Sequence, residues 1–248
     1  MDLGIAGKRA AVAASTSGLG FAAAQALAAE GVQVAICGRQ RERVEKAAAA
    51  IGGEVVPIEA DVSTPEGATG FVDEAQRALG QVDILVVNVP GTPAGTFGST
   101  ALEAYGPALQ NHVLSAVGMC KAAVPGMQSR GWGRVVAITS VGVRQPFPDL
   151  ILSNTGRSGL TAFLKTLALE VAPDGVTVNT VQPGYHRTER LESWAGERLA
   201  DLAADVPANA VGEPADFGAV VAFLCSRSAG YLTGAAVPVD GGLYGGLQ

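Results

Sequence analysis

The feature that most constrains the fold of this chain is a repeated alternation of short apolar runs with alanine-rich segments. "RAAVAAS" (9–15) is followed by "GFAAAQALAAEG" (20–31), and "VQVAICG" (32–38) is followed by "RERVEKAAAAIG" (41–52). The short apolar runs are typical of buried strands, and the alanine-rich segments have the length and composition of helices. This alternation predicts a parallel sheet that is covered by helices on both faces.

The same alternation continues to the end of the chain and gives seven strands in total. Two long helices are expected over about 102–128 and 149–172, and no repeat or linker interrupts the pattern. We therefore predict an α/β fold in which residues 1–248 form a single domain around a doubly wound, seven-stranded parallel sheet. The segment at about 185–214 breaks the alternation and is expected to form a mobile insertion over a ligand site. The five further strands are expected at 55–62, 83–89, 133–140, 176–184 and 235–242.

Composition excludes several classes of function. The 248 residues are 48% hydrophobic, which suits one soluble domain with a sizeable core. The formal net charge of −6 does not favour binding to the negatively charged backbone of a nucleic acid. No apolar run reaches the length of a membrane span and no cleavable leader opens the chain, so we expect a cytoplasmic protein without a membrane partner. The three cysteines lie singly in apolar contexts, which predicts reduced core thiols and no metal site.

A glycine-rich turn, "AASTSGLG" (13–20), joins the first strand to the first helix. Gly18 and Gly20 allow the backbone to approach a pyrophosphate, and the free N–H groups at the start of the helix favour negative charge. The position of this turn between a strand and a helix predicts a dinucleotide-binding, Rossmann-like domain.

These features resemble the short-chain dehydrogenase/reductase family, in particular its 3-oxoacyl-acyl-carrier-protein-reductase-like members. The family's T-G-x-x-x-G-x-G loop lies on 13–20, with Ala13 and Ala14 replacing the first two residues, and "VDGG" (239–242) matches its terminal signature. The Ala14 replacement carries no cost if its φ is negative. The resemblance covers the whole chain and implies that the cofactor contacts Ser15, Ser17, Gly18, Leu19, Gly20, Asp61, Val62, Asn88 and Thr188.

The residues at the end of the second strand bear on which nicotinamide cofactor is bound. An acidic residue there would accept hydrogen bonds from the adenosine ribose and repel a 2′-phosphate. This chain has Gly38 followed by Arg39. Because a guanidinium can hold a phosphate through two hydrogen bonds, we predict that NADP(H) is preferred over NAD(H). The alternative is that Arg39 only begins the charged helix.

The resemblance implies a catalytic set of Asn, Ser, Tyr and Lys, of which this chain keeps the first two. Asn111 and Ser140 match the family's Asn and Ser. Ser153 and Arg157 stand where the family's Tyr and Lys are expected, and their spacing places both on one face of a helix. Serine is a far weaker acid than tyrosine, and arginine does not give up its proton, so proton donation is weakened. Alternatively, Ser153 is only a small helix residue, and Arg157 contacts the ribose or a phosphate of the cofactor.

The insertion at 185–214 supplies candidate substrate contacts. Tyr185 and His186 follow the sixth strand, and Trp194 lies further along the insertion. The apolar residues of the insertion predict an apolar ligand, although the same residues could pack only against one another. The histidines at positions 112 and 186 can equally be structural.

Three functions remain open on this reasoning. The first is an atypical NADP(H)-dependent short-chain oxidoreductase that acts on the carbonyl or hydroxyl group of an apolar small molecule or an acyl substrate. The second is a non-redox lyase, isomerase or dehalogenase-like enzyme, and the third is a pseudoenzyme that binds the cofactor without turnover. Motifs of serine hydrolases, zinc proteases and P-loop proteins are absent from the sequence.

The resemblance also implies a homotetramer in which the helices of Asn111 and Ser153 pair across a two-fold axis. Four apolar residues recur at helical spacing after Ser153 and could supply the interface, or could be core of a single subunit. These residues are Leu160, Phe163, Leu164 and Leu167.

Overall fold

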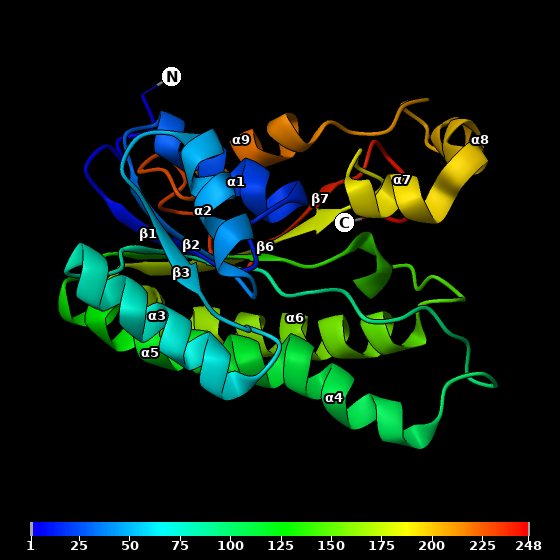
Figure 1. Ribbon diagram of the computed structural model, residues 1–248, viewed down its shortest axis with the longest axis horizontal. Helices are drawn as coiled ribbons and strands as arrows, with labels where there is room; N and C mark the ends of the chain where they lie inside the picture. Colours follow the sequence, from blue (N-terminus) through cyan, green and yellow to red (C-terminus); the bar gives the residue numbers. More distant parts are fainter. Residues whose placement is uncertain (1, 248) are drawn as a thin grey trace.

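A computed structural model describes residues 2–247 and contains one parallel sheet of seven strands in the order β3-β2-β1-β4-β5-β6-β7 (Figure 1). Every neighbouring pair of strands is parallel, so their carboxyl ends share one edge. The predicted single-domain α/β fold with a seven-stranded parallel sheet is therefore confirmed. The strands are β1 (Arg9–Val12), β2 (Gln33–Gly38), β3 (Val55–Glu59), β4 (Ile84–Val87), β5 (Gly133–Ile138), β6 (Val176–Pro183) and β7 (Ala236–Val239).

Helices cover both faces of the sheet. Figure 1 shows α1, α2 and α9 on one face and α3, α4, α5 and α6 on the other, with α7 and α8 beyond the end of β6. The helices are α1 (Gly18–Ala29), α2 (Arg41–Ile51), α3 (Pro65–Leu79), α4 (Tyr105–Leu109), α5 (Ser115–Ser129), α6 (Ile151–Val171), α7 (Glu189–Ala195), α8 (Leu199–Ala204) and α9 (Pro214–Leu224). Among residues 2–247, no helix is long and apolar enough to cross a membrane.

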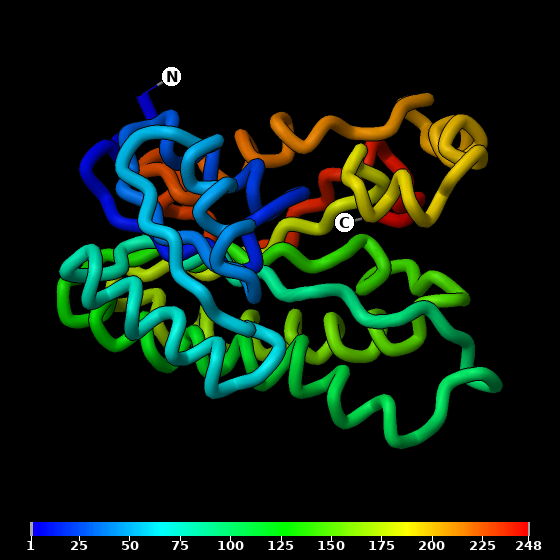
Figure 2. Tube along the Cα trace, in the orientation of Figure 1, coloured from blue at the N-terminus to red at the C-terminus, as the bar shows by residue number. Residues whose placement is uncertain are grey.

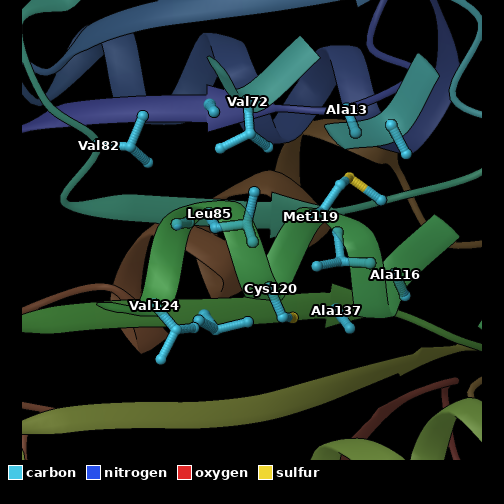
Figure 3. Packing of buried hydrophobic residues seen from close by; sticks show 14 of the residues in the cluster. Ala13, Val72, Val82, Leu85, Ala116, Met119, Cys120, Val124 and Ala137 are labelled. Carbon is cyan, nitrogen blue, oxygen red and sulfur yellow. The ribbon is translucent and has the colours of Figure 1, made fainter. Parts of the chain in front are cut away.

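The core consists of two apolar clusters, one on each face of the sheet. Successive residues of a strand point to opposite faces, so Ala11 joins the cluster beneath α3, α5 and α6, while Val12 joins the cluster beneath α1 and α9. Figure 3 shows how Met119 and Cys120 of α5 pack against Leu85 of β4. This two-sided burial explains why most strands are apolar on both faces, although β6 carries the buried polar residues Thr177, Asn179, Thr180 and Gln182.

The strand order reverses between β1 and β4, because β1 leads outward to β2 and β3 and β4 leads in the other direction. Ligands of such sheets bind in the crevice at this point, outside the carboxyl ends of the strands. The trace in Figure 2 shows that the segment after β6, which carries α7 and α8, lies at the same edge.

The first long helix differs in detail from the prediction over 102–128. It is built from a 3₁₀ turn (Leu102–Ala104), α4, a π-helical turn (Gln110–Leu114) and α5. The second long helix, α6, begins and ends within two residues of its predicted bounds. Single π-helical turns often lie at functional sites, and this turn contains Asn111.

The residues expected to form a subunit interface divide into two groups. Leu160 and Leu164 are 1% exposed and belong to the core of this chain, so they cannot supply the interface. Phe163 and Leu167 are only partly buried and pack at the edge of the same cluster. The strongly exposed leucines of these helices include Leu102, Leu114 and Leu169.

Candidate active site

The glycine-rich loop lies at the amino end of α1. Gly18 has φ = +61°, a conformation that glycine adopts without strain, and Ser17 immediately precedes the helix without capping it through its side chain. Gly18 also lies beside the start of the insertion, since a Cβ atom at Gly18 would be 3.6 Å from Cγ2 of Thr188. The structure therefore brings the loop and Thr188 to one place, with the N–H groups of the first turn of α1 beside them.

The first residues of the loop differ from expectation. Ala14 has φ = +46°, in the left-handed region, so its replacement of glycine does carry strain. The Ser15 hydroxyl is fully buried, donates a 2.6 Å hydrogen bond to the Val12 carbonyl and accepts one from the Cys37 N–H. This hydroxyl is turned into the sheet rather than toward the open side of the loop, so Ser15 does not present it to a phosphate as expected.

Gly20 is the most tightly enclosed glycine of the loop. A Cβ atom there would lie 2.6 Å from Nδ2 of Asn88 and 2.7 Å from the Ala14 carbonyl oxygen. Asn88 donates a 3.0 Å hydrogen bond from Nδ2 to that carbonyl oxygen. The side chain of Asn88 therefore ties the end of β4 to the strained loop, at the point where the strand order reverses.

The end of β2 is crowded by the same loop. A Cβ atom at Gly38 would lie 2.6 Å from Cγ2 of Thr16, so a larger residue at position 38 requires Thr16 to move. The Arg39 side chain is exposed next to this position. Asp61 accepts hydrogen bonds from the hydroxyl and N–H of Ser63, which lower the pKa of its carboxyl group, and Arg39 lowers it further.

Val62, also expected near the cofactor, is buried in the core, while Asp61 beside it is exposed. Leu19 is partly buried against the cluster beneath α1, so its side chain serves packing. These two residues can contribute backbone atoms or a packed wall to a ligand rather than polar side chains.

Ser140 follows β5 at the carboxyl edge of the sheet. Its hydroxyl accepts a 3.0 Å hydrogen bond from the Gly142 N–H. Nearby, Asn154 donates a 2.7 Å hydrogen bond from Nδ2 to the Phe147 carbonyl, which ties the segment after Ser140 to α6. Ser140 thus keeps its own proton available for donation to a ligand.

Ser153 and Arg157 lie on α6 with both side chains half-buried. Arg157 donates two 2.8 Å hydrogen bonds from Nη1 to the carbonyl oxygens of Ile138 and Thr139, the two residues before Ser140. Burial lowers the pKa of Arg157 to about 10, and the nearby Arg190 contributes in the same direction. Arg157 therefore stays charged at neutral pH and fixes the end of β5.

Asn111 lies in the π-helical turn and donates a 2.8 Å hydrogen bond from Nδ2 to the Pro90 carbonyl. His112 is fully buried, and its ring packs so closely on α6 that a Cβ atom at Gly156 would be 2.7 Å from Cδ2. Burial lowers the pKa of His112 to about 3, so its ring is neutral. The structure thus brings the π-helical turn against the helix of Ser153 and Arg157.

Arg190 is a site residue that reasoning from the sequence missed. It comes from α7, donates a 3.2 Å hydrogen bond from Nη2 to the Thr92 carbonyl, and packs directly on Gly91. A basic residue two positions after Thr188 was the available signal, but nothing local to the sequence indicates which segment it contacts. Asn154 was missed for the same reason.

The aromatic residues of the insertion are placed differently from one another. Tyr185 lies between Phe147 and Trp194, with ring centroids 6.1 Å and 6.5 Å away. Burial raises the pKa of Tyr185, which keeps its hydroxyl protonated. His186 packs edge-on against Phe217 of α9, with the ring centroids 5.1 Å apart, and also lines a hollow together with Tyr185.

His186 is buried between Phe217 of α9 and Gly212, and its role at a substrate stays a prediction. Burial lowers the pKa of His186. Within residues 2–247, no cluster of three His, Cys, Asp or Glu side chains has the arrangement of a metal site.

The arrangement fits a dinucleotide. The Gly18 and Gly20 positions provide the close backbone approach, and the first turn of α1 provides N–H donors for a pyrophosphate. Ser140, Arg157 and Asn111 converge on the same edge of the sheet, where a nicotinamide ring could lie beside a substrate oxygen. Such a site can bind and orient both a cofactor and a small molecule.

Comparison with known proteins agrees with this geometry. The model of the enoyl-(acyl carrier protein) reductase family matches residues 13–244. The human dehydrogenase/reductase SDR family member 4 is 34% identical over 244 residues, which cover 96% of this chain and 88% of the relative. Acetoacetyl-CoA reductase of Cupriavidus necator is 33% identical over 240 residues, which cover 95% of this chain and 97% of the relative.

Among solved structures, L-sorbose reductase of Gluconobacter frateurii, complexed with NADPH and L-sorbose, superposes with a TM-score of 0.93. Its sequence is 33% identical, and the match covers 100% of both chains. The chain therefore belongs to the short-chain dehydrogenase/reductase family of oxidoreductases, as its sequence motifs indicated.

Proposed function

We propose that this protein is an atypical NADP(H)-dependent oxidoreductase that interconverts a carbonyl and a hydroxyl group of a small molecule with an apolar part. The observation that carries the proposal is the meeting, at one edge of the sheet, of the glycine-rich loop with Ser140, Asn111 and Arg157. The family membership supports redox chemistry, and the L-sorbose reductase structure contains NADPH.

When bound, the nicotinamide supplies or accepts the hydride. The residues of this chain position the reacting groups and handle the proton. The Ser140 hydroxyl accepts a hydrogen bond from the Gly142 N–H through a lone pair, which leaves its hydrogen available. It can therefore donate a hydrogen bond to the substrate oxygen. Arg157 carries a fixed positive charge next to Ser140 and favours negative charge that develops on that oxygen.

Ser153 occupies the position of the family's tyrosine and is too short and too weak an acid to replace it fully. Proton transfer from a positioned acid typically accelerates a reaction about 10²–10⁴-fold. We therefore propose slow turnover, or turnover of activated substrates, in which the Ser140 and Ser153 hydroxyls and a water relay the proton.

The preference for NADP(H) is supported by the end of β2. An acidic side chain at position 38 would require Thr16 to move, whereas Gly38 fits beside it, and the exposed Arg39 can meet a 2′-phosphate. Titration at moderate salt should give a lower Kd for NADPH than for NADH in the parent and near-equal values in Arg39→Ala. Equal or tighter binding of NADH by the parent would overturn this preference.

The apolar part of the substrate is assigned to the aromatic group of Phe147, Tyr185 and Trp194, which lies between the Ser140 segment and α7. Trp194 is 41% exposed, so a ligand can reach it. Replacement of Trp194 by Ala should raise KM for long-chain ketones more than for short ones.

Hydride transfer is the experiment that tests the proposed function. Oxidation of NADPH is followed by nicotinamide absorbance with a panel of activated ketones and aldehydes. We expect turnover by the parent and a loss of about 10²-fold in kcat/KM for Ser140→Ala, whose hydroxyl contacts the reacting oxygen. The control is Ser129→Ala, at the far end of α5, which should match the parent.

If the parent binds NADPH but oxidises it with no member of the panel, the redox proposal fails and a cofactor-binding protein without turnover takes its place. If a product forms while the nicotinamide absorbance stays constant, a non-redox reaction replaces it.

A further inference from the structure

Four buried polar atoms without hydrogen-bond partners lie in one part of the molecule. They are Oγ1 of Thr92, Oδ1 of Asn111, and Nδ1 and Nε2 of His112. The side chains of these residues are 7%, 8% and 0% exposed, respectively. Asn111 is tied to Pro90, two residues before Thr92, and His112 follows Asn111 in the π-helical turn, so the residues of this cluster come from two neighbouring segments. Buried polar groups are rarely left unpaired, so this cluster indicates a bound polar group.

Two arginines lie close to this cluster. Arg190 hydrogen-bonds the Thr92 carbonyl and packs on Gly91. Arg157 is the residue after Gly156, on which the His112 ring packs. Both guanidinium groups are therefore next to residues that carry unpartnered atoms.

Neither arginine has an acidic partner. The ion pairs found within residues 2–247 involve Arg41, Arg130 and Arg187, and the hydrogen bonds of Arg157 and Arg190 go to backbone carbonyls. Arg157 is half-buried and Arg190 is exposed. The two positive charges repel each other, and an anion between them would relieve that repulsion. Burial lowers the pKa values of Arg157 and His112, and the neighbouring arginine charges lower them further.

The donors and acceptors among the unpartnered groups indicate which hydrogen-bonding groups a ligand of this cluster must carry. A threonine hydroxyl and the N–H of a neutral imidazole can both donate hydrogen bonds, as can the two guanidinium groups. Oδ1 of Asn111 can only accept, so it requires a donor such as a hydroxyl group or water. A carboxylate beside a hydroxyl group satisfies both requirements. In the corresponding oxo acid, the carboxylate still accepts from the donors, and a water must donate to Oδ1 of Asn111.

We propose that Arg157, Arg190, Thr92 and His112 form a carboxylate-binding subsite, and that the substrate is an oxo or hydroxy acid with an apolar tail. This inference rests on the proposed oxidoreductase function and assigns its substrate class. The carboxylate lies between the two arginines, the reacting oxygen lies at Ser140, and the tail extends toward Tyr185 and Trp194.

The test compares 2-oxohexanoate with 2-hexanone, which shares its apolar tail but lacks the carboxylate. Binding is measured by calorimetry and turnover by NADPH oxidation, in the parent, Arg190→Gln and Arg190→Lys. Arg187→Gln is the matched control, because Arg187 lies in the same insertion but pairs with Glu192 and Glu213.

Hydrogen bonds to charged groups contribute enough to change affinity about 10–100-fold. The parent should therefore bind 2-oxohexanoate at least about 10-fold more tightly than 2-hexanone. Arg190→Gln should lose that difference, Arg190→Lys should keep part of it, and Arg187→Gln should keep all of it. Equal binding of the two compounds by the parent would overturn the carboxylate subsite.

The diphosphate of the cofactor is the other possible source of an anion near Arg190. If Arg190→Gln raises the Kd of NADPH about 10-fold and leaves the affinity for 2-oxohexanoate unchanged, the anion is the diphosphate and the substrate assignment is wrong. Arginine-dependent binding of 2-oxohexanoate without any NADPH oxidation would instead support the subsite and contradict the redox function. Oxidation of NADPH with 2-hexanone but not with 2-oxohexanoate would support the redox function and contradict the carboxylate subsite.

Discussion

Nδ2 of Asn88 donates a 3.0 Å hydrogen bond to the carbonyl oxygen of Ala14, which joins the end of β4 to the loop after β1. The bond crosses the point at which the strand order reverses, where ligands of parallel sheets bind. Gly20 leaves the space that this bond needs. The loop is therefore held in place by a residue that lies far from it in the sequence.

We expect Gly20→Ala to destabilise the protein by about 1–3 kcal/mol, because the new methyl group overlaps Asn88 and the Ala14 carbonyl. The same change should raise the Kd of NADPH several-fold. Urea unfolding and fluorescence titration measure the two effects. The control is Gly70→Ala in α3, where no atom lies within 4 Å of the new Cβ atom and about 0.5–1 kcal/mol of stabilisation is expected. A Gly20→Ala protein as stable as the parent would contradict the packing argument.

We expect Ala14→Gly to stabilise the protein by about 1 kcal/mol. Glycine removes the left-handed strain of φ = +46°, and the greater freedom of the unfolded chain offsets only part of that gain. Ala13→Gly is the matched control, because Ala13 is buried without positive φ and its replacement should destabilise. The midpoint of urea unfolding should shift in opposite directions for the two variants, and shifts of the same sign would show that Ala14 is unstrained.

The double substitution Ser153→Tyr with Arg157→Lys should increase turnover of activated ketones with NADPH. It restores a proton donor and its partner on one face of α6, next to Ser140. The gain should reach at most about 10²-fold, because α6 is tightly packed at Gly156 against His112 and a tyrosine at position 153 is not supported by neighbours selected for it. Steady-state kinetics measure the change. A double variant that folds and binds NADPH but reduces no ketone faster than the parent would contradict our account of this site.

Ser153→Ala tests whether the present serine takes part in proton transfer. If it relays a proton, kcat should fall several-fold with little change in the Kd of NADPH. An unchanged kcat would assign Ser153 a packing role only.

Stability should fall as the pH decreases below about 6.5, because His112 takes up a proton readily in the unfolded chain but only near pH 3 in the folded protein. The unfolded state then binds more protons, so one such group contributes a slope of about 1.4 kcal/mol per pH unit within this window. For His112→Leu, urea unfolding between pH 4.5 and 6.5 should give a free energy of unfolding that depends less steeply on pH, as the linkage relation requires. The decrease in slope should correspond to about one proton taken up on unfolding. An unchanged slope would mean that His112 is protonated in the folded protein.

The homotetramer remains a prediction, now with different contact residues. Leu114 and Leu169 are 52% and 70% exposed on the helical layer that carries Asn111 and Ser153. Sedimentation should give a species of four 25.0 kDa chains, and Leu114→Glu should shift it toward smaller species. A single 25.0 kDa species at micromolar concentration would contradict the prediction.

The sequence by itself determined the sheet, the helices and the position of the glycine-rich loop. Apolar periodicity, helix length and turn glycines are properties of neighbouring residues, so "RAAVAAS" and "VQVAICG" already indicate β1 and β2. The spacing of Ser153 and Arg157 likewise placed both on α6 before the packing of that helix was known.

Only the tertiary structure decided how the site residues are used. The positive φ of Ala14, the inward hydroxyl of Ser15 and the contact of His186 with Phe217 depend on elements that are distant in the sequence. Arg190 reaches Gly91 across about a hundred residues, and His112 meets Gly156 because α6 packs against the π-helical turn. Such contacts follow from how whole elements pack, and no local pattern of residue types encodes them.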